Sequence, residues 1–389
     1  MTLVGGRVAL SAGESIQTNI GIGGSRIRRL DPKLSCAPLL DLTGFLILPG
    51  LINAHDHLEF NLFPRLGQGP YLNATEWAQD IYRPSESPIR PHLLVPKTIR
   101  LFWGAIKNLL SGVTTVSHHN PYRRDIFERR FPVHVVKRFG WAHSLRFSSD
   151  AEERFRKTPA GVPFIIHAGE GRDAQARDEI LQLQTHGMLA PSTVIVHSVA
   201  LKSDDLSLLA QRGVSLIWCP TSNYFTLGQT LAPEVLRSGI PVALGTDSAL
   251  TAQGDLLNEL CAARRHVHLF RLYEMVTSQA ARILRLDSGE GSIREGGLAD
   301  LLVVADKRQT PAEALLDLRP EMVILRGRIK LLSSRMADWL CLRKLPNFQA
   351  IEVEGRGRYL IACRVAALAA RTRKHLGNDF RLAGKKLVC

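Results

Sequence analysis

Residues 45–57 have the sequence FLILPGLINAHDH, an apolar run that ends in two histidines separated by one residue. In an extended strand the side chains of residues i and i+2 point to the same face, so His55 and His57 are expected to project together from the strand end. Two imidazoles placed in this way can share a metal ion such as zinc or iron. The same spacing also fits two ordinary histidines, so the interpretation depends on what the other strands carry.

Downstream of this run, short apolar segments alternate with amphipathic ones. The segments predicted as strands are 51–54, 114–117, 133–136, 141–147, 164–166, 193–196, 215–218 and 242–245. The segments predicted as helices include 98–110, 178–186, 202–211 and 232–237. This alternation predicts parallel βαβ units, and seven or eight of them fit a closed (β/α)8 TIM barrel. Almost no room for a helix separates 133–136 from 141–147, so we expect an irregular barrel there.

Both ends of the chain have a different character, with short strand-like runs and glycine-rich turns. We therefore predict an α/β protein with the TIM barrel at 50–291. A small composite β-sandwich domain is predicted from 1–49 together with 292–358. The last residues, 359–389, are predicted to be a basic and partly helical C-terminal tail.

The composition is that of a globular protein with a basic excess, 50 Lys and Arg against 36 Asp and Glu. The positive charges are spread along the chain without an aromatic-rich nucleic-acid module, so we interpret them as solvated surface and expect no nucleic-acid partner. No apolar run reaches the ~20 residues that cross a bilayer, and no signal peptide is visible. Six cysteines without CxxC spacing indicate a reduced, cytoplasmic protein. A small-molecule substrate is expected, and a homo-oligomer is an open alternative.

Three further predicted strands end in side chains that suit a metal site. His167 and His197 end two of them and Asp247 ends a third, while Glu170 follows His167 in the next loop. The C-terminal ends of barrel strands meet at one mouth, where ligands and catalytic groups of TIM-barrel enzymes lie. Taken singly, His197 could be a hydrogen-bonded core histidine and Asp247 a helix N-cap. Taken together, four polar strand ends predict a metal centre.

Two other patterns are interpreted as unrelated to this centre. His266 and His268 repeat the HxH spacing, but they fall in a predicted helical stretch at 255–284, where i and i+2 point about 200° apart. Lys137 follows the third predicted strand rather than the fourth, so it is a poor candidate for a carboxylated lysine that bridges two metals. We therefore interpret His266 and His268 as surface residues, and the absence of a bridging lysine favours one metal ion over two.

The motifs resemble those of the amidohydrolase superfamily and, within it, of the branch of cytosine-, adenosine- and guanine-type deaminases and chlorohydrolases. Residues 48–57 are similar to the first-strand signature of that family, and HAGE at 167–170 resembles its HxxE element. CPTSN at 219–223 is similar to a CPxSN segment, and GTDS at 245–248 resembles the aspartate motif of strand eight. The resemblance covers residues 40–330, although the segment between 119 and 164 is short for the family.

The resemblance implies specific roles. It implies four ligands for one divalent metal ion, zinc in the first place with iron or manganese as alternatives: His55, His57, His167 and Asp247. It implies three catalytic residues: Glu170 as the proton shuttle, His197 on the water that the metal activates, and Asp247. Residues near the mouth that we predict as substrate contacts are His119, Asn223 and Ser248.

The resemblance further implies hydrolysis of a non-peptide C–N bond in a small cyclic or amidine-like substrate, with release of ammonia. Two alternatives remain open from the sequence. The same metal site could act on a halide, amide or lactam leaving group, or the chain could be a non-catalytic scaffold that uses its basic C-terminal residues as a contact surface.

Overall fold

The segment predicted to carry the first ligands forms two consecutive buried strands, β7 (Phe45–Pro49) and β8 (Leu51–Asp56), with Gly50 between them. The computed structural model describes residues 1–128, 130–342 and 345–389. β7 belongs to a large mixed sheet, where it runs antiparallel to β16 and parallel to β2, and β8 belongs to a parallel sheet. One continuous run of chain therefore connects the two β-structures of the protein.

In the described part of the chain, eight strands run in two parallel groups. One group has the order β10-β9-β8 and the other the order β11-β12-β13-β14-β15. Besides β8, their bounds are β9 (Val113–His118), β10 (His134–Val135), β11 (Gly140–Trp141), β12 (Phe164–Ala168), β13 (Thr193–His197), β14 (Ser215–Trp218) and β15 (Val242–Leu244). A bridge between Asp56 and Asp247 joins the two groups on the side of β8 and β15. The predicted strands are thus present, but the one expected at 141–147 is only the two-residue β11.

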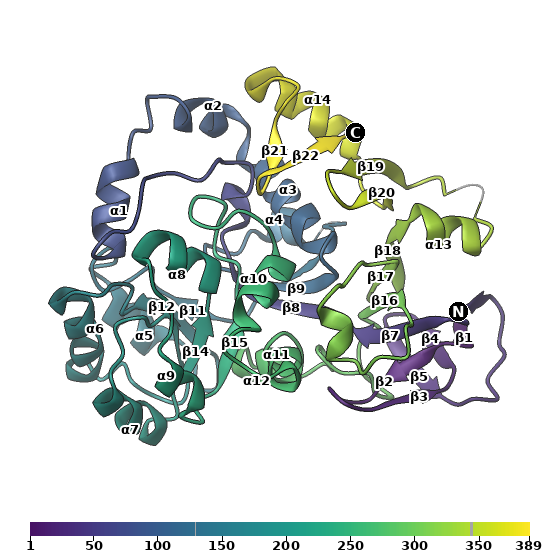
Figure 1. The fold of residues 1–389 in the computed structure, drawn as a ribbon, viewed down its shortest axis with the longest axis horizontal. Coiled ribbons are helices and arrows are strands. Elements are labelled where there is room, and N and C mark those ends of the chain that lie inside the picture. Colours follow the sequence, from purple (N-terminus) through teal and green to yellow (C-terminus); the bar gives the residue numbers. More distant parts are fainter. Residues whose placement is uncertain (129, 343–344) are drawn as a thin grey trace.

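Helices connect and cover these strands (Figure 1). Four were predicted with similar bounds: α3 (Lys97–Leu109), α6 (Ala174–Thr185), α7 (Ser203–Gln211) and α9 (Pro233–Arg237). The others in this region are η1 (Leu58–Phe60), α1 (Ala74–Ile81), α2 (Ile89–Leu94), α4 (Arg124–Phe127), α5 (Ala151–Lys157), α8 (Pro220–Leu227), α10 (Leu256–Ala263), α11 (Leu269–Met275) and α12 (Ser278–Ile283). The helical stretch expected at 255–284 is therefore three helices.

This division corrects the sequence interpretation of His266 and His268, which do not lie inside a helix. His268 is the N-cap of α11, where its Nδ1 accepts a hydrogen bond from the backbone N–H of Phe270 at 3.3 Å. His266 lies between α10 and α11 and its Nε2 is 2.7 Å from the hydroxyl of Tyr224. The first backbone N–H groups of a helix have no partner inside the helix, and the His268 side chain accepts from one of them. This cap allows a new helix, α11, to begin after His268.

Both ends of the chain share one ten-stranded sheet with the order β21-β22-β19-β20-β18-β17-β16-β7-β2-β3. In this sheet β7 pairs antiparallel with β16 (Leu301–Ala305), and the register runs from Pro49 opposite Leu301 to Phe45 opposite Ala305. The other members are β2 (Arg7–Ala9), β3 (Ser15–Gln17), β17 (Met322–Leu325), β18 (Arg328–Ser333), β19 (Gln349–Val353), β20 (Gly357–Ile361), β21 (Arg381–Leu382) and β22 (Lys385–Val388). A four-stranded sheet, β5-β4-β1-β6, contains β1 (Thr2–Val4), β4 (Ile20–Gly23), β5 (Arg26–Leu30) and β6 (Leu39–Asp41). η2 (Glu313–Leu315) and α13 (Ser334–Trp339) complete this part of the chain.

The C-terminal residues, which we predicted as a basic tail, pack against the rest of the protein. α14 (Val365–Leu376), predicted at 362–375, lies beside α2 and α3, and the hairpin β21–β22 follows it (Figure 1). The indole N–H of Trp103 in α3 donates to the hydroxyl of Thr372 in α14 at 2.8 Å. Part of the basic charge here is paired, because Lys385 and Arg356 both contact the buried carboxylate of Asp255. The sequence did not predict these strands or this packing.

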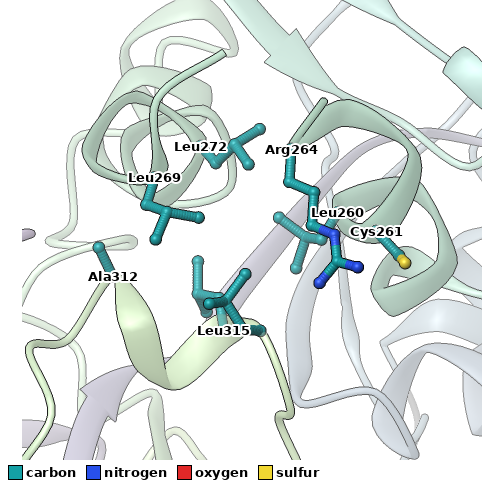
Figure 2. A pocket seen from close by; sticks show the side chains of 8 residues that line it. Leu260, Cys261, Arg264, Leu269, Leu272, Ala312 and Leu315 are labelled. Atoms are coloured by element: carbon teal, nitrogen blue, oxygen red, sulfur yellow. The ribbon is translucent and has the colours of Figure 1, made fainter. Parts of the chain in front are cut away.

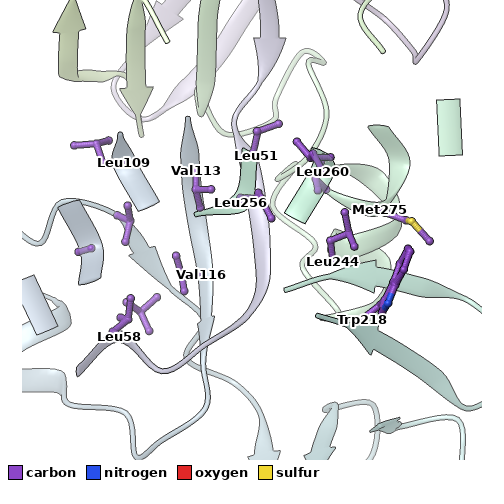
Figure 3. Packing of buried hydrophobic residues seen from close by; sticks show 14 of the residues in the cluster. Leu51, Leu58, Leu109, Val113, Val116, Trp218, Leu244, Leu256, Leu260 and Met275 are labelled. Atoms are coloured by element: carbon purple, nitrogen blue, oxygen red, sulfur yellow. The ribbon is translucent and has the colours of Figure 1, made fainter. Parts of the chain in front are cut away.

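The strands that carry the predicted site are held in a continuous apolar core (Figure 3). Leu51 in β8, Val116 in β9, Trp218 in β14 and Leu244 in β15 are all fully buried. Burying one such side chain contributes about 1.5–3 kcal/mol. The core therefore holds the strand ends rigidly, and the side chains that they carry have little freedom to move.

Among the described residues, no helix combines the length and the apolar character needed to cross a membrane.

Candidate metal and catalytic site

Four strand ends bring histidines and an aspartate to one place. His55 lies in β8 and His57 follows it, His167 lies in β12, His197 ends β13, and Asp247 comes shortly after β15. The Nε2 atoms of His167 and His55 are 3.2 Å apart. The Oδ1 atom of Asp247 is 3.6 Å from His57 Nε2 and 3.8 Å from His55 Nε2. These atoms form two groups that could hold a metal ion, His55–His57–Asp247 and His55–His167–His197, and all five residues are buried.

The backbone at two of these positions has an unusual conformation. His197 has φ +71° and Asp247 has φ +55°, in the left-handed region that residues other than glycine seldom adopt. Such a conformation costs roughly 1–3 kcal/mol, and it persists where surrounding structure enforces it, which is common at functional sites. Both residues sit where the chain turns out of a strand while the side chain stays at the mouth. Backbone strain thus supports the sequence-based choice of these two positions.

Hydrogen bonds at Nδ1 fix which ring nitrogen faces the centre. His167 Nδ1 is 2.7 Å from the carbonyl oxygen of His143, an acceptor, so Nδ1 carries the proton and Nε2 presents its lone pair inward. His197 Nδ1 is 2.8 Å from Asn223 Oδ1. Burial, together with the neighbouring histidines, lowers the pKa of His55 and of His167 well below the usual value. Neutral imidazole is the form that binds metal ions.

The carboxylate of Asp247 is held ionised and oriented. Its Oδ2 accepts hydrogen bonds from the hydroxyls of Ser222 at 2.6 Å and Thr251 at 2.8 Å, which leaves Oδ1 facing the histidines. Burial by itself would raise the pKa of Asp247, but the neighbouring His197 and His57 side chains and the two hydroxyl donors lower it overall. The donor set is therefore neutral nitrogens with one carboxylate oxygen. That set fits a divalent ion of the zinc, iron or manganese type.

Glu170 lies beside this centre in the loop after β12. Its Oε1 is 3.5 Å from His197 Nε2, and its side chain is 14% exposed. Burial and the negative charges of Asp247 and Glu179 raise the pKa of Glu170 well above its usual value. Glu170 also lines a pocket together with His143, Phe147, His167 and Glu179. A carboxyl group that favours its protonated form, at the edge of a pocket and next to a buried histidine, suits general acid–base chemistry.

The predicted substrate contacts lie at different depths. His119 is buried against the rings of the histidine cluster, 4.5 Å from His167 between ring centroids, and its Nε2 is 3.1 Å from the carbonyl oxygen of Ala142. Asn223 is behind His197, whose orientation it sets. Ser248 is buried next to Asp247. Their contact with substrate stays a prediction, whereas their contacts with the histidines and with neighbouring backbone are part of the structure.

Helix α8 supports two site residues from one element, which sequence reasoning missed. Ser222 and Asn223 are adjacent on α8; Ser222 donates to Asp247 after β15, and Asn223 accepts from His197 at the end of β13. Thr221 anchors the start of the helix, since its backbone N–H donates to Glu259 at 3.0 Å and its hydroxyl contacts the same carboxylate. Burial raises the pKa of Glu259 to about 8. The CPTSN segment was the available signal, but it did not reveal which strand each side chain would reach.

A close approach between β8 and β15 explains the glycine before the aspartate. A Cβ added to Gly245 would lie 2.6 Å from His55 Cβ and 2.9 Å from the His55 backbone nitrogen. We expect Gly245→Ala to cost roughly 1–3 kcal/mol of unfolding free energy, because the two strands must separate. Chemical denaturation of the metal-free protein measures this. The control is Gly13→Ala, whose added Cβ meets only the Phe270 ring edge at 3.1 Å, and an equal loss in both variants would contradict the expectation.

A second pocket has the wrong chemistry for the reaction. It lies between α10, α11 and η2 and is lined by leucines, Ala312, Cys261 and one cation, Arg264 (Figure 2). Neither a histidine nor a carboxylate contributes to this lining. The pocket that contains Glu170, by contrast, has two histidines and two carboxylates in its lining.

Comparison with known proteins agrees with this geometry. The amidohydrolase family profile matches residues 153–330. A 5-methylthioadenosine/S-adenosylhomocysteine deaminase of Syntrophobacter fumaroxidans is 28% identical over 340 residues, which cover 71% of this chain and 76% of the relative. A 5′-deoxyadenosine deaminase of Methanothrix thermoacetophila is 25% identical over 349 residues, covering 75% and 82%.

Solved structures give the same picture of the fold. An adenosine deaminase of Xanthomonas campestris with bound zinc superposes with a TM-score of 0.69 at 17% identity, covering 96% of this chain and 97% of that one. An atrazine chlorohydrolase of Arthrobacter aurescens TC1 complexed with zinc gives 0.68 at 19% identity, covering 84% and 94%. These likenesses imply a TIM-barrel type of fold with mixed α/β content, and the sequence relatives confirm the resemblance drawn from the motifs.

Proposed function

We propose that this chain belongs to the amidohydrolase superfamily and is a deaminase that hydrolyses a non-peptide C–N bond of a small cyclic, amidine-like substrate and releases ammonia. The observation that carries the proposal is the placement of Glu170 beside His197 at the edge of the His/Asp cluster. Relatives named as deaminases of adenine nucleosides make 6-aminopurine nucleosides the first class to test. In such a ring the exocyclic amine and a ring nitrogen form an amidine.

We assign one divalent ion to the cluster, zinc first, with these ligands: His55, His57, His167 and Asp247. Orientation supports the assignment, because the His167 Nε2 lone pair faces His55 and one Asp247 oxygen is left free for the centre. When bound, such an ion polarises water and brings its pKa from about 15.7 down towards ~7. His197 stays outside the ligand set in this proposal and orients the attacking water through Nε2.

The residues of the chain account for the remaining steps. Glu170 in its protonated form gives a proton to the ring nitrogen, which makes the adjacent carbon more electrophilic. The resulting carboxylate then takes a proton from the attacking water and passes it to the leaving amine. Asn223 keeps His197 in one tautomer throughout, since its amide oxygen accepts from Nδ1.

Ammonia release tests the proposal. Zinc-loaded protein incubated with adenosine, 5′-deoxyadenosine, 5-methylthioadenosine, cytosine and guanine is expected to release ammonia from at least one 6-aminopurine nucleoside, and a coupled dehydrogenase assay measures it. The control is the Glu170→Gln protein at the same zinc occupancy. If the protein turned over only halide or amide substrates, the deaminase proposal would be wrong and the alternative leaving groups would be supported. A protein that binds no zinc, iron or manganese would support the scaffold alternative.

Four finer points belong to the same proposal. The parallel strands form a closed (β/α)8 barrel at 50–291, and residues 1–49 with 292–358 form a composite β-sandwich domain. The shared sheet of β7 and β16 supports the second of these. A cytoplasmic location and a homo-oligomeric state also stay predictions, and light scattering of the purified protein tests the latter.

A further inference from the structure

A buried ion pair lies behind the two histidines of β8. Asp56 stands between His55 and His57 in sequence, so its side chain points to the opposite face of the strand from theirs. There its Oδ2 is 2.8 Å from the Nζ of Lys107 in α3, and the two side chains are 0% and 4% exposed. A charge pair removed from water in this way is costly unless further hydrogen bonds complete it.

Neutral donors complete the shell of Asp56. Asn61 donates to Oδ1 at 2.8 Å, and Asn108 donates to Oδ2 at 2.7 Å. The hydroxyl of Thr246 and the amide of Asn53 reach the same Oδ2 at 3.1 Å each. Both oxygens of Asp56 therefore accept hydrogen bonds, and the donors come from β8, the end of η1, α3 and the segment after β15.

The same network ties the histidine strand to the aspartate segment. Thr246 also receives a hydrogen bond from Lys107 Nζ at 3.0 Å, and its backbone N–H donates to the carbonyl of His55 at 2.8 Å. The next residue, Asp247, donates from its backbone N–H to the same carbonyl at 3.1 Å, and its own carbonyl accepts from the N–H of His57 at 3.2 Å. Side chains and backbone thus lock the segments that present His55, His57 and Asp247.

We propose that Asp56 and Lys107 are positioning residues that set metal affinity by holding these two segments in register. Neither is among the residues that could hold the ion. They act through Thr246, which contacts both of them and stands next to the Asp247 ligand in a strained backbone segment. This inference rests on the metal ligands assigned under the proposed function. Losing an outer partner of a metal site typically weakens binding by about 10–100-fold.

The role of Asp56 and Lys107 is tested by the zinc affinity of the metal-free protein, measured by competition with a chelator. We expect Lys107→Met to weaken zinc binding at least about tenfold, while its circular dichroism matches that of the parent. The matched control is Arg356→Met, which breaks another buried ion pair, with Asp255 at 2.7 Å, and neither partner is among the residues that could hold the ion. That variant is expected to bind zinc within about twofold of the parent.

The outcomes are separable. Zinc affinity of folded Lys107→Met within about twofold of the parent would overturn the inference, and so would an equal loss in Arg356→Met, because affinity would then follow stability alone. If Lys107→Met does not fold, Thr246→Val decides, since it removes the shared hydroxyl without leaving a charge unpaired. An unchanged affinity in that variant overturns the inference and a loss supports it. A parent protein that binds no metal would instead refute the proposed function.

Discussion

His55→Ala is expected to lose both the metal ion and the activity. His55 belongs to both groups of potential ligands, and its ring is within 5.0 Å, between centroids, of the rings of His57 and His167. Removing it takes away the nitrogen that the two groups share, so neither retains three ligand atoms. Metal content by atomic emission and ammonia release under saturating substrate measure the two losses. We expect activity to fall by several orders of magnitude.

The chain offers a matched control for this variant. His266→Ala removes an exposed histidine that also stands in an HxH sequence, and its Nε2 contacts only the hydroxyl of Tyr224 among the hydrogen-bond partners described. It should keep its metal and its rate. Full metal occupancy in His55→Ala would show that the ligand set is wrong.

Glu170→Gln is expected to keep the metal and lose most of the rate. The amide has nearly the same shape as the carboxyl group but cannot move a proton, and general acid–base groups typically contribute about 10²- to 10⁴-fold. We expect kcat to fall by that factor with zinc content unchanged. Steady-state kinetics on the best nucleoside substrate, with metal analysis of the same sample, measure both quantities.

Glu179→Gln is the control for Glu170. Glu179 lines the same pocket, and burial raises its pKa to about 7, but its Oε2 accepts from the backbone N–H of Gly169 at 2.8 Å and so has a structural partner. Its replacement should change kcat much less than that of Glu170. Retained activity in Glu170→Gln would remove this residue from the mechanism, and lost zinc would make it a ligand.

The positions of the site residues were predictable because strand ends are visible in sequence. His55, His167, His197 and Asp247 each follow an apolar run, and parallel strands deliver their C-terminal ends to the same edge. Side-chain period two was enough to place His55 and His57 on one face. The structure brings all five residues together as this argument requires.

The supporting contacts were not predictable in the same way. Lys107 occupies an amphipathic helix, where a lysine normally indicates the solvated face, and only tertiary packing shows that it is buried against Asp56. The Nδ1 partner of His167 is a backbone carbonyl, which has no sequence signature. Strands β19 to β22 are short, and their pairing is set by long-range contacts rather than local pattern.

The pairing of β7 with β16 has a consequence for how the protein is made. β7 leads directly into the histidine strand, yet the strand that covers one of its edges comes about 250 residues later in the chain. At roughly 5–20 residues per second, a ribosome needs on the order of 10–50 s to deliver that partner. During this interval the edge of β7 that later pairs with β16 is unpaired, and this apolar strand can associate with other nascent chains. Ribosome-bound chains halted before residue 300 should therefore depend on chaperones, and chains halted well past residue 330 should not.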